Sequence, residues 1–135
     1  MPNSDVLQDD NHLTVNLAAS TTYGFRFVIF QTSASATAGL KLALNGTATV
    51  TSLKAQVYIY DDTTNLLAGF ARLTAFGGAG VGAGLAVGDN YAVIEGTIEV
   101  STAGTFLLQW AQNLADIVNA TTVQRNSNLI VVQVA

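Results

Sequence analysis

The chain has 135 residues, enough for one domain, and no cysteine, which excludes disulfides, thiolate metal sites and cysteine nucleophiles. Only 10% of its residues are charged, and its five basic residues are scattered singly in a chain of net charge −4, which argues against a surface for nucleic acid. No run of about 18 apolar residues is present, so we expect no membrane-spanning helix, and the acidic, polar start is unlike a secretory signal.

The N-terminal part predicts an arm followed by two strands. Residues 1–11 are polar, and we expect them to form a flexible N-terminal arm ahead of a single domain over residues 12–135. His12–Leu17 alternates apolar and polar residues, as a half-buried strand does. After a turn at residues 18–22, Tyr23–Gln31 is the clearest strand, because aromatic and β-branched residues recur there with a period of two.

The next part predicts two strands joined by a tight turn. Leu40–Leu44 places three leucines on one face. The following Asn45-Gly46 pair tolerates positive φ and predicts a hairpin into Thr47–Tyr60. The alternation slips near Ser52–Leu53, which indicates a bulge or a bend.

The middle of the chain is rich in turn residues. Asp61–Asn65 predicts a turn, and Leu66–Phe76 is a further apolar stretch. Gly77–Gly88 has glycine at half of its positions and predicts a long mobile loop. This loop lacks the lysine and serine or threonine of a phosphate-binding loop, so we interpret it as structural.

The C-terminal part predicts three long strands and one short strand. Gly96 interrupts the first of them and indicates a bulge or a close approach of two backbones. Residues 111–118 also fit a helical stripe, and a short helix there remains an alternative. The predicted strands are Ala92–Val100, Thr105–Gln112, Thr121–Gln124 and Asn128–Val134.

Eight or nine short strands separated by turns, without an extended helical pattern, predict an all-β antiparallel sandwich or barrel. Eight strands with one long loop favour a jelly roll, in which two sheets are wound as Greek keys. We therefore expect an antiparallel jelly-roll sandwich of about eight strands, preceded by the polar arm.

The sequence contains no set of residues typical of catalysis. His12 stands alone, and no serine occupies a nucleophile elbow. Adjacent aspartates in a turn are able to bind calcium, but the ligand density of a calcium loop is missing. We expect no enzymatic activity, no catalytic residue, no cofactor and no metal. The acidic pairs are Asp9 with Asp10, Asp61 with Asp62, and Glu95 with Glu99.

The scarcity of charge favours a chain that covers part of its surface with copies of itself or with a larger partner, because interface cores are depleted of charge. A neutral, threonine-rich β surface is the alternative. Tyr58 and Tyr60 share one face of a strand, and Trp110 is suited to a core, an interface or a sugar platform. These three aromatic residues are the candidate subunit interface.

The chain from Thr22 onwards, about four fifths of the whole, resembles a β domain of tailed-bacteriophage virion proteins. It opens with an aromatic strand, a small-residue loop and a Gly-Leu-Lys strand. Its ending is also similar to the trimeric jelly rolls of the C1q and tumour-necrosis-factor type. The closing motifs are Ile94-Glu95-Gly96, Ala103-Gly104-Thr105, Leu108-Gln109-Trp110-Ala111-Gln112 and Ser127.

The resemblance implies a homotrimeric jelly roll on a virus particle. A decoration (cement) protein that binds the major capsid protein on the outer capsid surface fits a free-standing module, with no nucleic-acid or membrane partner. A receptor-binding or tip domain of a head or tail fibre is the alternative. A hydrolase of cell-surface glycans is a third hypothesis, with Glu95, Glu99 and the paired aspartates as its only candidate residues. The candidate capsid contacts lie in the arm and are Asp5, Val6, Leu7, Gln8, Asp9 and Asp10.

Overall fold

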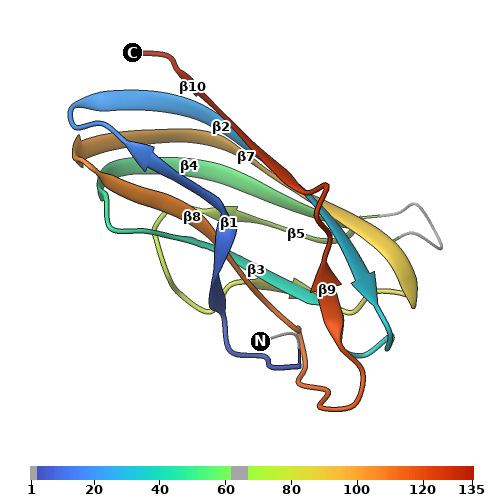
Figure 1. The fold of residues 1–135 in the computed structure, drawn as a ribbon. Coiled ribbons are helices and arrows are strands. Elements are labelled where there is room, and N and C mark those ends of the chain that lie inside the picture. Colours follow the sequence, from blue (N-terminus) through green and yellow to red (C-terminus); the bar gives the residue numbers. More distant parts are fainter. Residues whose placement is uncertain (1–2, 62–66) are drawn as a thin grey trace.

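The computed structural model describes residues 3–61 and 67–135, and every regular element in these two ranges is a β-strand (Figure 1). In this part of the chain no helix is long and apolar enough to span a bilayer. The strands are β1 Gln8–Leu17, β2 Thr21–Ser33, β3 Leu40–Asn45, β4 Thr49–Tyr60, β5 Leu67–Leu73, β6 Val81–Ala83, β7 Gly88–Thr102, β8 Gly104–Ala111, β9 Thr121–Val123 and β10 Asn128–Gln133.

The strands form two antiparallel sheets in the order of a jelly roll. The smaller sheet has the order β1-β8-β3-β6, and the larger sheet has the order β10-β2-β7-β4-β5, with β9 also beside β2. Among the first eight strands, the chain crosses to the other sheet at every connection except the one from β4 to β5. This winding confirms the predicted all-β jelly-roll sandwich. Strands β9 and β10 extend the larger sheet beyond the eight-stranded unit.

The core lies between the two sheets and is built from alternate residues of each strand. Phe25, Phe27 and Ile29 of β2 point inward from the larger sheet, and Phe106 of β8 meets them from the smaller sheet. The Phe106 ring lies edge-to-face with Phe25 at 4.8 Å and with Phe27 at 5.5 Å, and Phe76 stacks on it at 5.9 Å. Burying such a side chain is worth about 1.5–3 kcal/mol, so the period-two pattern decides which face of each strand turns inward.

The predicted hairpin at Asn45-Gly46 is wrong, because this turn carries the chain from one sheet to the other. Strand β3 lies in the smaller sheet and β4 in the larger one. The link is fastened to Thr105 at the start of β8, whose carbonyl accepts the Ala48 backbone N–H at 3.1 Å. Gly46 is required there: its φ is 152°, and a Cβ would lie 2.0 Å from the Thr105 carbonyl oxygen. A turn signal in the sequence therefore marks the conformation of the link but not the partner of the next strand.

Two predicted irregularities have different outcomes. The bulge expected near Ser52 is confirmed, because the register between β4 and β7 shifts on both sides of Val50. Gly96 shows no register shift against either neighbouring strand. A Cβ at Gly96 would lie 1.9 Å from the Lys54 carbonyl oxygen, so this glycine marks a close approach of two backbones.

The glycine-rich segment is not a loop throughout, because Val81–Ala83 forms β6 and pairs with β3 at the edge of the smaller sheet. This strand raises the count in the described residues to ten, above the eight or nine expected. It was missed because three residues among glycines carry no periodic signal. The turn predicted at Asp61–Asn65 lies, apart from Asp61, outside the described residues. Residues 112–120 form a loop and not a helix.

The N-terminal arm ends earlier than predicted. Strand β1 begins at Gln8, so residues 8–11 belong to the domain, and Gln8 lies opposite Trp110. Ahead of it, the Ser4 carbonyl accepts the Gln112 backbone N–H at 2.8 Å. This part of the strand pairs through its backbone at a sheet edge, and its polar side chains give no alternation from which a strand is predicted.

Candidate interaction surface

The outer face of the larger sheet carries a continuous group of apolar and aromatic side chains. The strand registers place them in two neighbouring rows, each crossing β2, β7, β4 and β5. One row alternates with the fully buried Val57 and Ile94, so its side chains point away from the core. We name this group the outer-face band. The rows are Val28, Val93, Tyr58 and Phe70, and Phe30, Tyr91, Tyr60 and Leu67.

The outer-face band is open to solvent at its β5 end. On β5, Phe70 is 70% exposed and Leu67 43%, and Tyr91 on β7 is 41% exposed. The rings of Tyr60 and Tyr91 stack at 4.7 Å, and the Tyr58 hydroxyl is hydrogen-bonded to Gln56. Rigid aromatic groups that keep a polar end are the side chains most enriched at the centres of protein interfaces. The predicted pair Tyr58 and Tyr60 therefore lies within a larger set.

A polar row borders the outer-face band. It crosses the same strands two residues further along each of them. Its members are Arg26, Glu95, Gln56 and Arg72. Arg26 and Glu95 form an ion pair of 3.8 Å whose side chains are each about half exposed. An exposed pair of this kind adds little stability, about 0–1 kcal/mol. An apolar centre with a polar rim is the usual layout of a protein interface.

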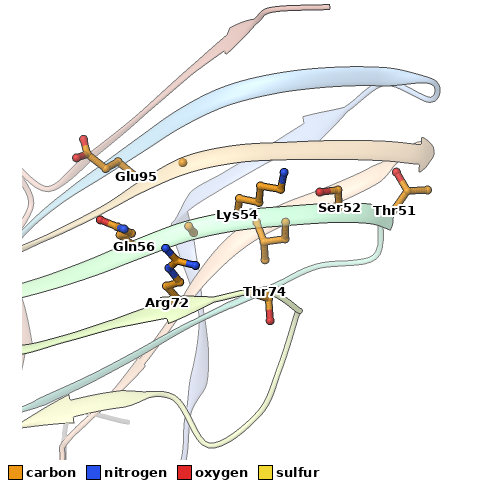
Figure 2. Close-up of a pocket in the computed structure, with 10 residues that line it drawn as sticks. Thr51, Ser52, Lys54, Gln56, Arg72, Thr74 and Glu95 are labelled. Atoms are coloured by element: carbon orange, nitrogen blue, oxygen red, sulfur yellow. The ribbon is translucent and has the colours of Figure 1, made fainter.

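A shallow pocket of about 700 Å³ lies over this polar row (Figure 2). Strand β5 ends opposite Ala55, whereas β4 continues back to Thr49, so one edge of β4 has no strand beside it here. Lys54 and Arg72 line the pocket, and neither makes an ion pair with another described residue. The pocket holds one carboxylate, that of Glu95, and its chemistry suits a polar or anionic group of a partner and not acid–base catalysis by paired carboxylates.

Trp110 does not belong to the same surface as the two tyrosines. It lies on β8 of the smaller sheet, packs against the core, and donates its indole N–H to the Asp10 carboxylate at 3.1 Å. The same carboxylate accepts the backbone N–H groups of His12 and Leu13 at 2.7 and 2.8 Å. Asp10 thus organises the register break in β1. The three predicted interface residues are divided between two sheets.

The predicted arm residues fall into two groups. Gln8, Asp9 and Asp10 are part of β1, and Gln109 donates its side-chain N–H to Asp9 at 2.8 Å. Asp5 and Val6 precede the strand and are exposed, with Val6 at 61%. Of the predicted capsid contacts, Asp5 and Val6 are therefore exposed and lie outside the strand, whereas the exposed Gln8 and Asp9 lie within β1. Leu7 is half-buried, and its side chain lies beside Gly80.

The acidic residues considered for chemistry do not gather. Glu95 and Glu99 are four residues apart on β7, which separates their Cα atoms by about 13 Å along the strand. Asp61 accepts the Ala86 backbone N–H at 3.2 Å, and Asp62 lies outside the described residues. Within residues 3–61 and 67–135, no group of three or more acidic or histidine side chains is placed to hold a metal ion.

The second apolar surface lies at the edge of the larger sheet, on β10. Ile130, Val132 and Val134 are each exposed by more than half. The sequence pattern predicts β10 as a strand but does not show which side of it is exposed. The signal for the outer-face band was present in β2, where Val28 and Phe30 make the second face of the strand apolar. The sequence does not show which strands lie beside β2.

Comparisons with known proteins add no family. No protein-family model and no curated protein matches the chain. Among solved structures, one described as "Structure of infectious bursal disease virus Gx strain" aligns over 93% of this chain and 35% of that chain, with 11% sequence identity and a TM-score of 0.23. This chain thus spans about a third of that protein, and a likeness at this level supports no argument about function.

Proposed function

We propose that this chain is a structural protein of a virus particle, without enzymatic activity, that decorates the outer capsid surface as a homotrimer bound to the major capsid protein. The observation that carries the proposal is the outer-face band, an aromatic surface with a polar rim on a chain whose charged content is only 10%. The jelly-roll topology supports it further, as does the resemblance of the closing motifs to those of tailed-phage virion proteins.

The mechanism of such a protein is binding and not chemistry. A protein that binds the assembled shell but not its separate subunits stabilises the shell by mass action, by about 2.7 kcal/mol per site at a hundredfold excess over the dissociation constant. We assign the capsid contact to the exposed Asp5 and Val6, ahead of β1. We assign the contact between subunits to the outer-face band, with Tyr58 and Tyr60 near its centre and Phe70 at its β5 end.

The location of the protein on the particle tests the proposal. Particles labelled with an antibody to this chain should carry copies spread over the head. A few copies at a vertex or on the tail would instead support a receptor-binding or tip domain of a fibre. Absence of the chain from purified particles would overturn both.

A pair of surface variants tests the subunit contact. Phe70→Glu places a charge within the outer-face band and should weaken self-association at least tenfold, because a buried unpaired charge is costly. Val87→Glu is the matched control, since Val87 is 62% exposed and lies outside the band. Light scattering at micromolar concentration measures the mass of both. A monomeric wild-type protein, or equal masses for the two variants, would contradict the proposed interface.

A further inference from the structure

The open edges of the two sheets differ in how well they are protected against pairing with another strand. Strand β1 carries Asp9 and Asp10 and a break in its register, and β6 has only three residues. Strand β5 carries Arg72 and meets β4 through a register shift. Short length, charge and bulges are the usual means by which proteins keep such edges from pairing.

Strand β10 has none of these features. Asn128–Gln133 contains no charged residue and no proline, and it pairs with β2 over its whole length without a register shift. Its apolar residues have high β propensity. An edge of this kind is a site for pairing with a further strand.

The hydrogen bonds of β10 show which of its backbone groups face the open side. Val134 donates its N–H to the Thr22 carbonyl at 2.9 Å, so this N–H points to β2. Because the direction alternates along a strand, the N–H and C=O groups of Ile130 and Val132 also point to β2. Those of Leu129, Val131 and Gln133 point to the open side.

We propose that β10 pairs antiparallel with β10 of a second copy of this chain, about a two-fold axis at Val131. In this register Val131 lies opposite its own equivalent, and Leu129 lies opposite Gln133 of the second copy. Leu129, Val131 and Gln133 then each lie opposite a residue whose backbone N–H and C=O groups also point to the open side. This pairing gives about six backbone hydrogen bonds in total. The larger sheets of both copies join into one continuous sheet.

The side chains of β10 fit this register. Ile130 comes to lie beside Val132 of the second copy on the outer face, and both are 56% exposed in the single chain. No charged residue of β10 faces its equivalent across the axis, so no like-charge repulsion opposes the pairing. A shallow pocket of about 340 Å³ between β1 and β10, lined in part by Leu129 and Val131, leaves the inner side of β10 open as well.

A second copy is favoured over an unrelated strand because the match is symmetric. The polar residues Asn128 and Gln133 lie at the two ends of the strand, and the apolar residues lie around its centre. A two-fold axis at Val131 therefore places apolar residues against apolar residues at the centre of the contact, and Gln133 lies opposite Leu129 nearer each end. Six residues per copy make an interface at or below the low end of about 1,200 Å² in total, so we expect a dissociation constant in the micromolar range.

Single cysteines test the register, because the chain contains none of its own. Under a mild oxidant, Val131→Cys should form a covalent dimer, since paired Cα atoms in this position are about 5.5 Å apart and within reach of a disulfide. Val132→Cys is the matched control: its equivalent lies two residues away along the partner strand, beyond the reach of about 7 Å. No cross-link in Val131→Cys, or an equal yield in both variants, overturns the proposed register.

A second pair of variants tests the pairing without a cross-link. Gln133→Pro removes an N–H that faces the open side and leaves the bonds to β2 in place, whereas Gln133→Ala keeps that N–H. Sedimentation should show a doubling of mass with concentration for the wild type and Gln133→Ala, and at least tenfold weaker association for Gln133→Pro. Equal association of all three overturns the proposal, and thermal melts check that each variant is folded.

This inference does not depend on the proposed function. The increase in mass is measured from whatever unit the outer-face band forms: a monomer would double to a dimer, and a trimer, which carries three β10 edges, would form six-chain or larger assemblies. Loss of the cross-link with particle binding intact would remove the two-fold contact alone. An intact cross-link on a chain absent from virus particles would remove the virion role alone.

Discussion

The two sheets share one core but present different outer surfaces. Most outward positions of the smaller sheet are polar or small, among them Thr14, Asn16 and Lys41, and the outward-facing Ala43 and Leu107 are buried. The larger sheet exposes the outer-face band and the apolar edge of β10. A fold needs only one apolar face per sheet, so the second apolar face of the larger sheet is not explained by folding of the single chain.

The two ends of the chain attach to different sheets. Residues 3–7 are fastened near the end of the smaller sheet, through the Ser4 carbonyl and the Leu7 side chain. Strands β9 and β10 add to the edge of β2 in the larger sheet, and leave the outer face of that sheet uncovered. The chain thus uses its own ends to complete the smaller sheet and to widen the larger one. Widening an exposed apolar surface is useful when a partner covers it.

The largest expected effect separates the shared core from the exposed face. Phe106→Ala removes a fully buried ring that contacts Phe25, Phe27 and Phe76, and should lower the free energy of unfolding by about 3–5 kcal/mol. Phe70→Ala makes the same substitution on the outer-face band, where the ring is 70% exposed, and should change it by less than about 0.5 kcal/mol. Chemical denaturation measures both. Similar losses for the two variants would show that the band contributes to folding and is not free for a partner.

The fold class was predictable because it depends on local patterns. Alternation in Tyr23–Gln31 and Leu40–Leu44 reports which residues face the core, and turn residues report where strands end. The partner of each strand is decided by contacts distant in sequence, and for this reason the Asn45-Gly46 turn signal wrongly predicts a hairpin. Strand β6 is held by its pairing with β3 and has no pattern of its own.

The candidate surface was predictable only in part, for a related reason. Tyr58 and Tyr60 share a face of one strand, which alternation shows directly. That Phe70 and Tyr91 lie on either side of them follows from the registers of β5 and β7 with β4. Trp110 was grouped with the tyrosines on residue type alone, and its hydrogen bond to Asp10, a hundred residues away, carries no sequence signal.

A smaller effect is expected at the link between the two sheets. Gly46→Ala forces a Cβ against the Thr105 carbonyl at a positive φ and should lower the free energy of unfolding by about 3 kcal/mol. Gly77→Ala is the matched control: Gly77 also has a positive φ, of 77°, but nothing lies within 4 Å of its Cβ position, so about 1 kcal/mol is expected. Thermal unfolding compares the two. Equal losses would show that the link does not hold the sheets in their relative positions.

The smallest effect concerns the loop that returns the chain from the smaller sheet to the larger one. The pKa of Asp116 is held below its ordinary value, chiefly because the backbone N–H of Asn119 donates to its carboxylate at 2.9 Å, with further bonds from the Asn119 side chain and the Val118 N–H. A carboxylate whose pKa is lower in the folded state stabilises the fold above its unfolded pKa, and this contribution is lost as the pH falls through the folded pKa.

The ordinary pKa of an aspartate side chain is 3.8. The loop over residues 112–120 should therefore keep its structure at pH 3.8 and loosen only at a lower pH. Chemical shifts of the Asn119 amide measured against pH should show a midpoint below that value. Asp116→Asn should remove the transition and leave the outer-face band and the β10 edge unchanged, because Asp116 is on neither surface. A midpoint at or above 3.8 would mean that the Asn119 bonds do not hold this loop, and that its course between the sheets depends on the Gln112 side chain, which bonds the Asp116 N–H and the Asn119 carbonyl.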